Sequence, residues 1–254
     1  MRPILSLFVA AMPSVVWAGG AEMYEKAEFE AAGAKLLYRV LKPAKIEPGK
    51  KYPLVLFLHG AGERGDDNQA QLVHGGTLFT RKDNRAKYPC YVIFPQCPSG
   101  KRWVEVDWSD KEPHAAPKNP SVPMALTKRM LDRFVKGNAV DADRVYVMGL
   151  SMGGFGTWDF AQRYPDFVAA AVPICGGADN GTAKRIKHIP IWTFHGSADT
   201  AVWPVRTRTM VEALKKVKGN VRYTEYEKVG HNSWSRAFAE PDLLVWMFAQ
   251  KRAK

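Results

Sequence analysis

The sequence is poor in cysteine, with three in 254 residues: Cys90, Cys97 and Cys175. Cys90 and Cys97 flank a strand-like run at 91–95, and an extended strand of that length holds its ends roughly 20 Å apart, beyond disulfide reach. We therefore expect buried free thiols rather than a disulfide framework. No C-x-x-C or H-E-x-x-H motif occurs, so the sequence gives no support for a dedicated metal site.

An apolar run long enough for a membrane span is also lacking at the N-terminus. Residues 4–16 are mostly apolar and follow Arg2, but the run is too short to cross a bilayer. It leads to Val16-Trp17-Ala18, with small residues where a signal peptidase cleaves. We predict a signal peptide at 1–18, cleaved after Ala18, and a single catalytic domain at 19–254 that is secreted or periplasmic. A buried N-terminal strand or helix is the alternative.

Acidic residues are fewer than basic ones, 25 against 37, which gives a formal net charge of +12. The basic residues are scattered, with small groups near 42–51, 215–218 and 251–254, and none alternates with aromatic residues as a nucleic-acid surface would. We expect a solvated basic surface and no nucleic-acid partner. The content of 46% hydrophobic and 24% charged residues is that of a globular domain.

Strand-like and helix-like segments alternate along the chain. After a hairpin at 28–40 that turns at Ala32-Gly33, strands are predicted at 52–58, 91–94, 144–148, 168–174, 191–194 and 221–226. Helices are predicted at 69–79, 124–135, 155–164, 205–217 and 241–250, with an irregular excursion at 99–123. This alternation predicts an α/β fold with a mostly parallel central sheet and helices on both faces.

The most informative stretch is Gly149-Leu150-Ser151-Met152-Gly153. An apolar run at 144–148 precedes it and a helix-like run follows, which is the pattern of a nucleophile elbow. Such a turn raises the serine hydroxyl above the sheet edge and crowds its neighbours, so the positions two before and two after the serine must be small. Gly149 and Gly153 meet that requirement, although a glycine-rich loop without chemistry is the alternative.

Two further polar residues follow strands in the order that an α/β-hydrolase requires. Asp199 lies just after the strand at 191–194, and His231 lies in a loop after the strand at 221–226. Reacting groups collect at the carboxyl ends of strands in such sheets. We predict that His231 takes the proton of Ser151 and that Asp199 orients His231 and stabilises its charge.

Each of these residues has an alternative. Asp199 could be a turn former, and Asp179 is a rival acid that falls one strand too early. His59 and His195 each precede a glycine at a strand end, and we interpret them as structural donors that fix neighbouring loops.

An oxyanion requires two preorganised N–H donors. We expect one from Met152, the first residue of the helix after the serine, and one from Ala61 in the loop after the strand at 52–58, with Gly62 as an alternative. Three side chains on loops near the serine are predicted to contact substrate: Gln96, Trp103 and Trp234. The alternative for both tryptophans is packing of the excursion at 99–123.

Five stretches together resemble the exported α/β-hydrolase esterases, known as predicted peptidases or phospholipase/carboxylesterase-like proteins and related to feruloyl esterases and polyhydroxybutyrate depolymerases. They are residues 58–68, 95–98, 149–154, 173–177 and 231–234. The resemblance runs from about Leu36 to the C-terminus. It implies the α/β-hydrolase fold and serine ester hydrolysis without a cofactor, with Ser151, Asp199 and His231 as the triad.

Two departures from the resembled group bear on the substrate. Many relatives carry an N-terminal β-sandwich for which this chain has no room, and Trp203 stands where small or aliphatic residues are usual. We expect a serine carboxylesterase acting on small-molecule or polysaccharide-linked esters, with feruloyl or acetyl groups as candidates. A prolyl-oligopeptidase-like serine peptidase, a polyester depolymerase and a carbohydrate-binding protein are the alternatives. The sequence leaves the oligomeric state open.

Overall fold

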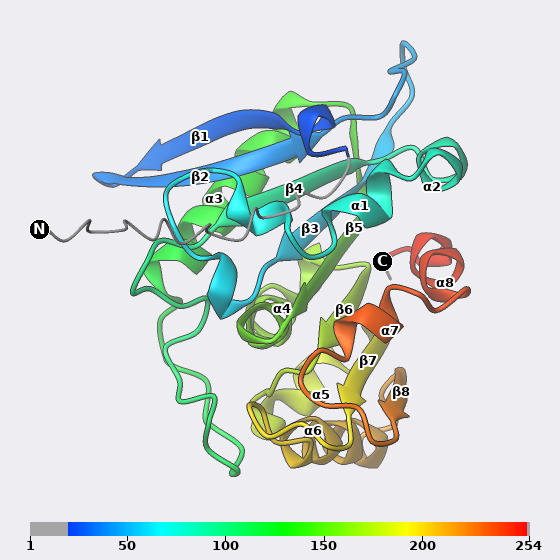
Figure 1. The fold of residues 1–254 in the computed structure, drawn as a ribbon. Coiled ribbons are helices and arrows are strands. Elements are labelled where there is room, and N and C mark those ends of the chain that lie inside the picture. The colour runs from blue at the N-terminus through cyan, green and yellow to red at the C-terminus, as the bar shows by residue number, and fades with distance from the viewer. Residues whose placement is uncertain (1–19, 253–254) are drawn as a thin grey trace, which may run out of the picture.

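The computed structural model describes residues 20–252, so the predicted signal peptide at 1–18 lies outside the described residues. Eight strands form one sheet in the order β1-β2-β4-β3-β5-β6-β7-β8 (Figure 1). Their bounds are β1 Glu25–Ala31, β2 Ala34–Leu41, β3 Tyr52–Leu58, β4 Tyr91–Gln96, β5 Val140–Leu150, β6 Ala170–Ile174, β7 Ile191–Gly196 and β8 Val221–Tyr226.

Two modes of pairing divide the sheet. The predicted hairpin pairs antiparallel as β1 and β2, and β2 pairs antiparallel with β4. From β4 through β3, β5, β6 and β7 to β8 every pairing is parallel. The prediction of a mostly parallel sheet is therefore confirmed, and the carboxyl ends of β3, β5, β6, β7 and β8 meet along one edge.

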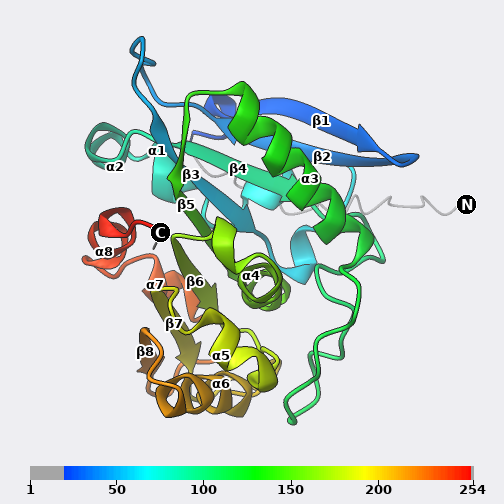
Figure 2. The same ribbon diagram turned by 180° about the vertical axis from the view of Figure 1, so that it is seen from behind.

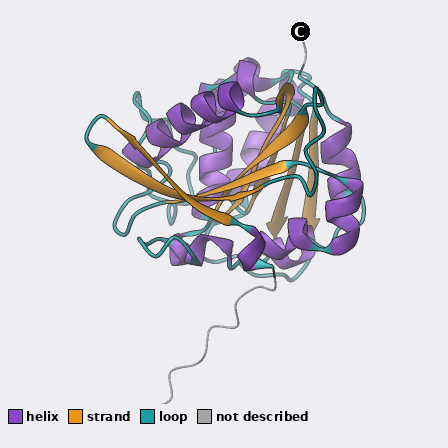
Figure 3. Cartoon of the chain, turned by 90° about the horizontal axis from the view of Figure 1, so that it is seen from above, coloured by secondary structure: helices purple, strands orange, loops and turns teal. Residues whose placement is uncertain are grey.

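Helices cover both faces of this sheet (Figures 1 and 2). One face carries α3 (Val122–Gly137), α4 (Met152–Arg163), α5 (Ala183–Ile186) and α6 (Val205–Lys216). The other carries α1 (Gly76–Thr80), α2 (Lys82–Lys87), α7 (Trp234–Ala237) and α8 (Leu243–Ala249). Figure 3 shows the strands between the two helical layers. A separate apolar core lies under each layer, because strands such as β3 are buried along their whole length.

Several predicted elements differ from the structure in their bounds. The single helix expected at 69–79 is instead a 3₁₀ turn, Ala70–Leu72, followed by α1. Gly75 separates them with a φ of 92°, and a Cβ there would overlap the ring of Phe57. The strand before the serine begins at Val140 rather than Arg144, because Val140 already pairs with Tyr52. The last helix begins at Leu243 rather than Pro241.

All three cysteines are free and buried, as predicted. Burial raises the pKa of each thiol to about 12, so these thiols stay protonated at neutral pH. Among residues 20–252, no helix is both long enough and apolar enough to cross a membrane.

Candidate active site

Ser151 stands on a sharp turn between β5 and α4. Its φ of 54° and ψ of −120° lie in a region that non-glycine residues seldom occupy. The turn needs glycine on both sides: a Cβ on Gly149 or Gly153 would overlap the carbonyl of Leu58. Ser151 also donates its backbone N–H to the Ile174 carbonyl at 2.9 Å. The strand, turn and helix expected of a nucleophile elbow are thus present.

A chain of hydrogen bonds joins Ser151 to His231 and Asp199. His231 Nδ1 lies 2.7 Å from Asp199 Oδ2, and His231 Nε2 lies 2.8 Å from Ser151 Oγ. Since an ionised carboxylate only accepts, Nδ1 carries the proton and Nε2 accepts from the serine hydroxyl. This is the tautomer that a general base for Ser151 requires. The three side chains come from loops after β5, β7 and β8, and the structure brings them together.

Asp199 is buried completely and accepts four N–H groups. Oδ1 accepts from the backbone of Ala201 at 2.9 Å and of Val202 at 3.0 Å. Oδ2 accepts from His231 and lies 3.2 Å from His195 Nε2. Burial by itself raises the pKa of Asp199, but the hydrogen bonds from His195, His231 and Val202 outweigh it and hold that pKa well below its usual range. The carboxylate therefore stays ionised at neutral pH.

Direct backbone contacts hold the loop of His231 against the loop of Asp199. Ala198 N–H donates to Val229 at 2.9 Å, and Lys228 N–H donates to Ser197 Oγ at 2.8 Å. A Cβ on Gly196 would overlap the carbonyls of Val229 and Gly230, so glycine there is what lets the two loops meet.

The loop after β3 approaches the serine from the other side. A Cβ on Gly60 would come within 3.7 Å of Ser151 Cβ, which places Gly60, the residue before Ala61, beside the elbow. Met152 is the first residue of α4, and the first four N–H groups of a helix have no intrahelical acceptor. His59 braces this loop: its Nδ1 donates to Gly60 O at 2.7 Å and its Nε2 accepts from Cys97 N–H at 2.9 Å.

Two of the three predicted substrate contacts are corrected by the structure. Trp103 has no exposed surface, and its indole N–H donates to the His59 carbonyl at 3.0 Å. Gln96 is 1% exposed; it accepts from Asn68 N–H at 2.7 Å and donates to Asp67 Oδ1 at 2.7 Å. A side chain without accessible surface cannot line an open site, so both residues support the loop after β3 instead.

Trp234 lies beside the imidazole of His231. The two rings are 5.4 Å apart and nearly perpendicular, and the His74 ring lies 5.3 Å away on another side of the indole. The indole is half-buried, so it remains in reach of a bound molecule. The rival acid Asp179 is engaged elsewhere, since it accepts from Gly181 N–H at 2.9 Å and Ala116 N–H at 2.8 Å.

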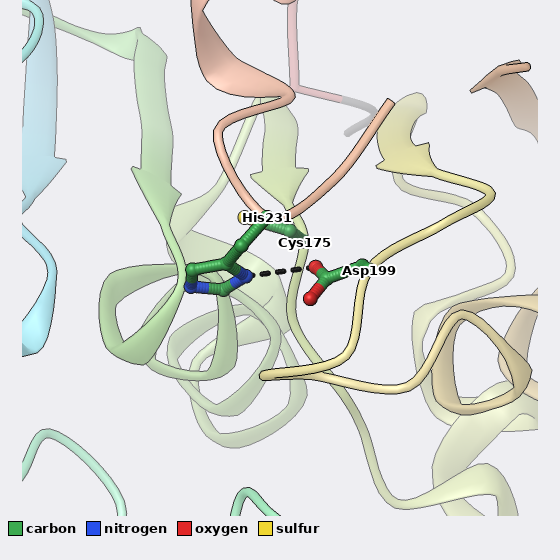
Figure 4. Close-up of side chains that lie close together, drawn as sticks. All are labelled: Cys175, Asp199 and His231. Carbon is green, nitrogen blue, oxygen red and sulfur yellow. Dashed lines mark hydrogen bonds and ion pairs between the residues drawn. The ribbon is translucent and has the colours of Figure 1, made fainter. Parts of the chain in front are cut away.

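Cys175 lies next to the acid and the base (Figure 4). Its sulfur and the ligand atoms of Asp199 and His231 all lie within 4.8 Å of one another. These donors do not suit a metal ion, because zinc requires a thiolate and burial raises the pKa of this thiol to about 12. The Asp199 carboxylate also already accepts four N–H groups.

Arg206 on α6 is a residue that sequence reasoning missed. It is 1% exposed, and its guanidinium donates to the carbonyls of Asp107 at 2.7 Å and Asp110 at 3.0 Å and contacts His114 Nδ1 at 2.6 Å. It therefore pins the excursion at 99–123 against α6, near the loop that carries Asp199. Its place in the helix 205–217 gave no signal, since basic residues on helices usually face solvent.

Comparisons with known proteins agree with the α/β-hydrolase fold. The phospholipase/carboxylesterase family profile matches residues 44–241. A crystal structure of a thermostable esterase superposes with a TM-score of 0.86 at 36% identity, over 91% of this chain and 64% of that chain.

Two curated relatives match parts of the chain. Poly(3-hydroxyalkanoate) depolymerase C of Paucimonas lemoignei is 33% identical over 126 residues, 49% of this chain and 28% of that protein. A bifunctional acetylxylan esterase/xylanase of Neocallimastix patriciarum is 26% identical over 168 residues, 66% of this chain and 22% of that protein. The matched region is thus about a quarter of the length of each relative. With the sheet order, the elbow and the family match in agreement, the chain belongs to the phospholipase/carboxylesterase family of α/β-hydrolases.

Proposed function

We propose that this protein is a serine carboxylesterase that works through an acyl-enzyme, with Ser151, His231 and Asp199 as its catalytic triad. The observation that carries the proposal is the hydrogen-bond chain from Ser151 Oγ to Asp199 on a strained elbow. A serine hydroxyl is a weak nucleophile until a neighbouring base accepts its proton, and His231 Nε2 is in position to do so.

In this mechanism Ser151 Oγ attacks the ester carbonyl while its proton passes to His231 Nε2. The resulting imidazolium is stabilised by Asp199 and then protonates the departing alcohol, which leaves the acyl group on Ser151. Water, deprotonated by His231, then attacks the acyl carbon. The bond from that carbon to Ser151 Oγ breaks, His231 returns the proton to Oγ, and the acid is released. The N–H groups of Met152 and Ala61 are the proposed donors to the oxyanion in both steps, and the α4 dipole adds positive potential at Met152.

We infer an acyl group of small size, such as acetyl. With Trp103 in the interior, only one of the two tryptophans expected on the walls, Trp234, stands beside the base. The acetylxylan esterase relative supports an acetyl ester on a polysaccharide, and the poly(3-hydroxyalkanoate) depolymerase relative makes a polyester the second candidate.

The decisive experiment compares wild type, Ser151→Ala and Ser235→Ala on 4-nitrophenyl acetate. Ser235 is an exposed serine on α7 and serves as the control. We expect Ser151→Ala to lose turnover by about 10⁴-fold or more while Ser235→Ala keeps the wild-type rate. Equal rates in wild type and Ser151→Ala would refute the proposal.

A substrate panel then ranks the candidates. Acetylated xylan, methyl ferulate, poly(3-hydroxybutyrate) and a peptide library are each offered to the wild type. Release of acetate above the other products supports the acetyl assignment, and cleavage of peptides without ester turnover would instead support a peptidase.

We further propose that the protein is exported, on the basis of the residue pattern at 1–18. N-terminal sequencing of the protein from its native host is expected to begin at Gly19. An intact Met1 on the protein in the cytosol would contradict export.

A further inference from the structure

Two buried histidines occupy equivalent places at the carboxyl ends of strands. His59 follows β3, and His195 is the residue before the last one of β7; each precedes a glycine, and neither has any exposed surface. Their hydrogen-bond partners differ in kind. His59 has one acceptor, the Gly60 carbonyl, and one donor, the Cys97 N–H. A neutral imidazole satisfies both, since it carries one N–H and one lone pair.

His195 faces acceptors on both of its ring nitrogens. Nε2 lies 2.9 Å from the Val202 carbonyl and 3.2 Å from Asp199 Oδ2, and both of these atoms can only accept. Nδ1 lies 2.8 Å from Thr207 Oγ1. The Thr207 hydroxyl has a single proton, which it donates to the Gly176 carbonyl at 2.7 Å. With that proton directed at Gly176, the hydroxyl can only accept from Nδ1, and in this arrangement both ring nitrogens carry protons.

We propose that His195 is a buried imidazolium, a positioning residue that neutralises and orients Asp199 and thereby sets the basicity of His231. This inference rests on the proposed esterase function for its kinetic consequence but not for the protonation state itself. A buried carboxylate needs a compensating charge, and His195 provides it at 3.2 Å, opposite the side on which His231 binds at 2.7 Å.

The other groups around His195 are compatible with a positive charge there. Glu225 is the residue of β8 that lies opposite His195 of β7 in the strand register. Its carboxylate accepts a hydrogen bond from Arg208 of α6 at 2.8 Å. The hydrogen bond from Arg208 holds the pKa of Glu225 below its usual value. The hydroxyl of Tyr223 donates to the same carboxylate. The thiol of Cys175, after β6, is protonated and neutral, as its pKa of about 12 requires.

The kinetic consequence follows from charge. A positive His195 opposes the protonation of His231 across the shared carboxylate, so it keeps the free base available to lower pH. Removing the charge is expected to move the acidic limb of the kcat/KM profile upward by about one pH unit. A role in packing alone would lower the rate or the stability and leave that limb in place.

The first test measures the protonation state in the wild-type protein and uses variants only to assign signals. The ring nitrogens of uniformly ¹⁵N-labelled histidine in the wild-type protein are recorded from pH 6 to 9, and signals are assigned by comparison with His195→Gln and His59→Gln. We expect two protonated nitrogens on His195 throughout, and one protonated and one bare nitrogen on His59. A bare nitrogen on His195 at pH 7 would overturn the proposal, whether or not the protein hydrolyses esters.

The second test measures the pH profile of kcat/KM for matched variants. His195→Gln and Thr207→Val are expected to shift the acidic limb upward together, because loss of the Thr207 hydroxyl removes the acceptor that keeps Nδ1 protonated. Thr207→Ser retains the hydroxyl and His59→Gln leaves His195 intact, so neither is expected to move the limb, even if His59→Gln lowers kcat. An unmoved limb in His195→Gln and Thr207→Val would contradict the role.

Discussion

The two sides of the candidate site are built by different means. The acid–base side, formed by the loops at 197–203 and 227–233, works through side chains: the Asp199 carboxylate lies within 3.2 Å of a ring nitrogen of both His195 and His231. The proposed oxyanion side, the loop at 59–65, works through backbone N–H groups and carries no charge at His59. The comparison teaches that a site built from side chains can be identified from the residue types in the sequence. A site built from backbone N–H groups cannot, because it depends on how closely two segments of the backbone approach each other.

The substitution expected to impair the acid–base side most is Asp199→Asn. The amide keeps the volume of the side chain but not its charge. It has a single oxygen, so it no longer accepts on both sides and does not hold His231 in the Nδ1–H tautomer as a carboxylate does. We expect kcat to fall by about 10⁴-fold. The unfolding free energy is expected to fall as well, because an ionised carboxylate whose pKa is held below its usual range stabilises the folded protein at neutral pH. Steady-state kinetics on 4-nitrophenyl acetate and urea unfolding measure the two quantities.

Asp179→Asn is the matched control, because Asp179 is the nearest rival carboxylate in the chain order and serves only to cap two backbone N–H groups. It is expected to keep kcat within about threefold of wild type. The two N–H groups bind different oxygens of Asp179, so an amide accepts from only one of them, but the hydrogen bonds of the triad are unchanged. A larger loss in Asp179→Asn than in Asp199→Asn would reverse the assignment of the acid.

On the oxyanion side the comparable break is Gly153→Ala. A Cβ at this position would overlap the Leu58 and His59 carbonyls, so the end of β3 must move away from the elbow. We expect kcat to fall by about 10²–10³-fold, as for the loss of one oxyanion donor, and the urea midpoint to fall as well. Gly62→Ala, with open space around its Cβ, is the control that should keep the urea midpoint of wild type.

The two sides also differ in their response to acid. Burial lowers the pKa of His59 to about 4, from roughly 6.5 in an unfolded chain. Between these values the unfolded chain binds a proton that the folded protein does not, so stability rises with pH in this window and falls as pH drops from 6.5 towards 4. We expect His59 to account for a loss of about 3 kcal/mol over that window.

Urea unfolding at pH 7 and pH 4.5 measures this loss, and His59→Gln removes the titrating group. The variant is expected to lose less stability on acidification than wild type does. His114 also contributes to the loss of stability on acidification, equally in wild type and variant. Its pKa is lowered to about 4, mainly by burial and to a smaller extent by the charge of Arg206. Equal losses in wild type and variant would show that His59 is accessible to protons while folded.

Much of the fold was accessible from the sequence, because β3 and β8 are bounded by clear changes of residue pattern. Both were predicted with their observed bounds, Tyr52–Leu58 and Val221–Tyr226. The predicted bounds were wrong where contacts between residues distant in sequence determine where an element begins or ends. The helix expected at 69–79 breaks at Gly75 because the backbone there packs on Phe57, and local propensity carries no record of that contact.

The same division applies to the site. Ser151, Asp199 and His231 were predicted to converge because each is a reactive residue type directly after a strand, and parallel strands bring their ends together. The second histidine on Asp199 was interpreted as a structural donor, since the sequence does not tell which nitrogen meets which partner. Burial of Gln96 and Trp103 could not be anticipated, because it depends on contacts between segments distant in sequence. Gln96 bonds the loop at 63–68, and Trp103 bonds the His59 carbonyl.

The smallest predicted effect distinguishes support of the oxyanion side from contact with substrate. Gln96→Ala removes the amide that accepts from Asn68 N–H and donates to Asp67. Leaving such buried partners unsatisfied costs about 1–3 kcal/mol, and the loosened loop should lower kcat while KM stays within about twofold. Gln250→Ala, at the end of α8, is the control expected to change none of these values. If Gln96→Ala instead raises KM strongly at unchanged stability, the amide binds substrate directly after a local opening, and the two sides of the site are more alike than their hydrogen bonds indicate.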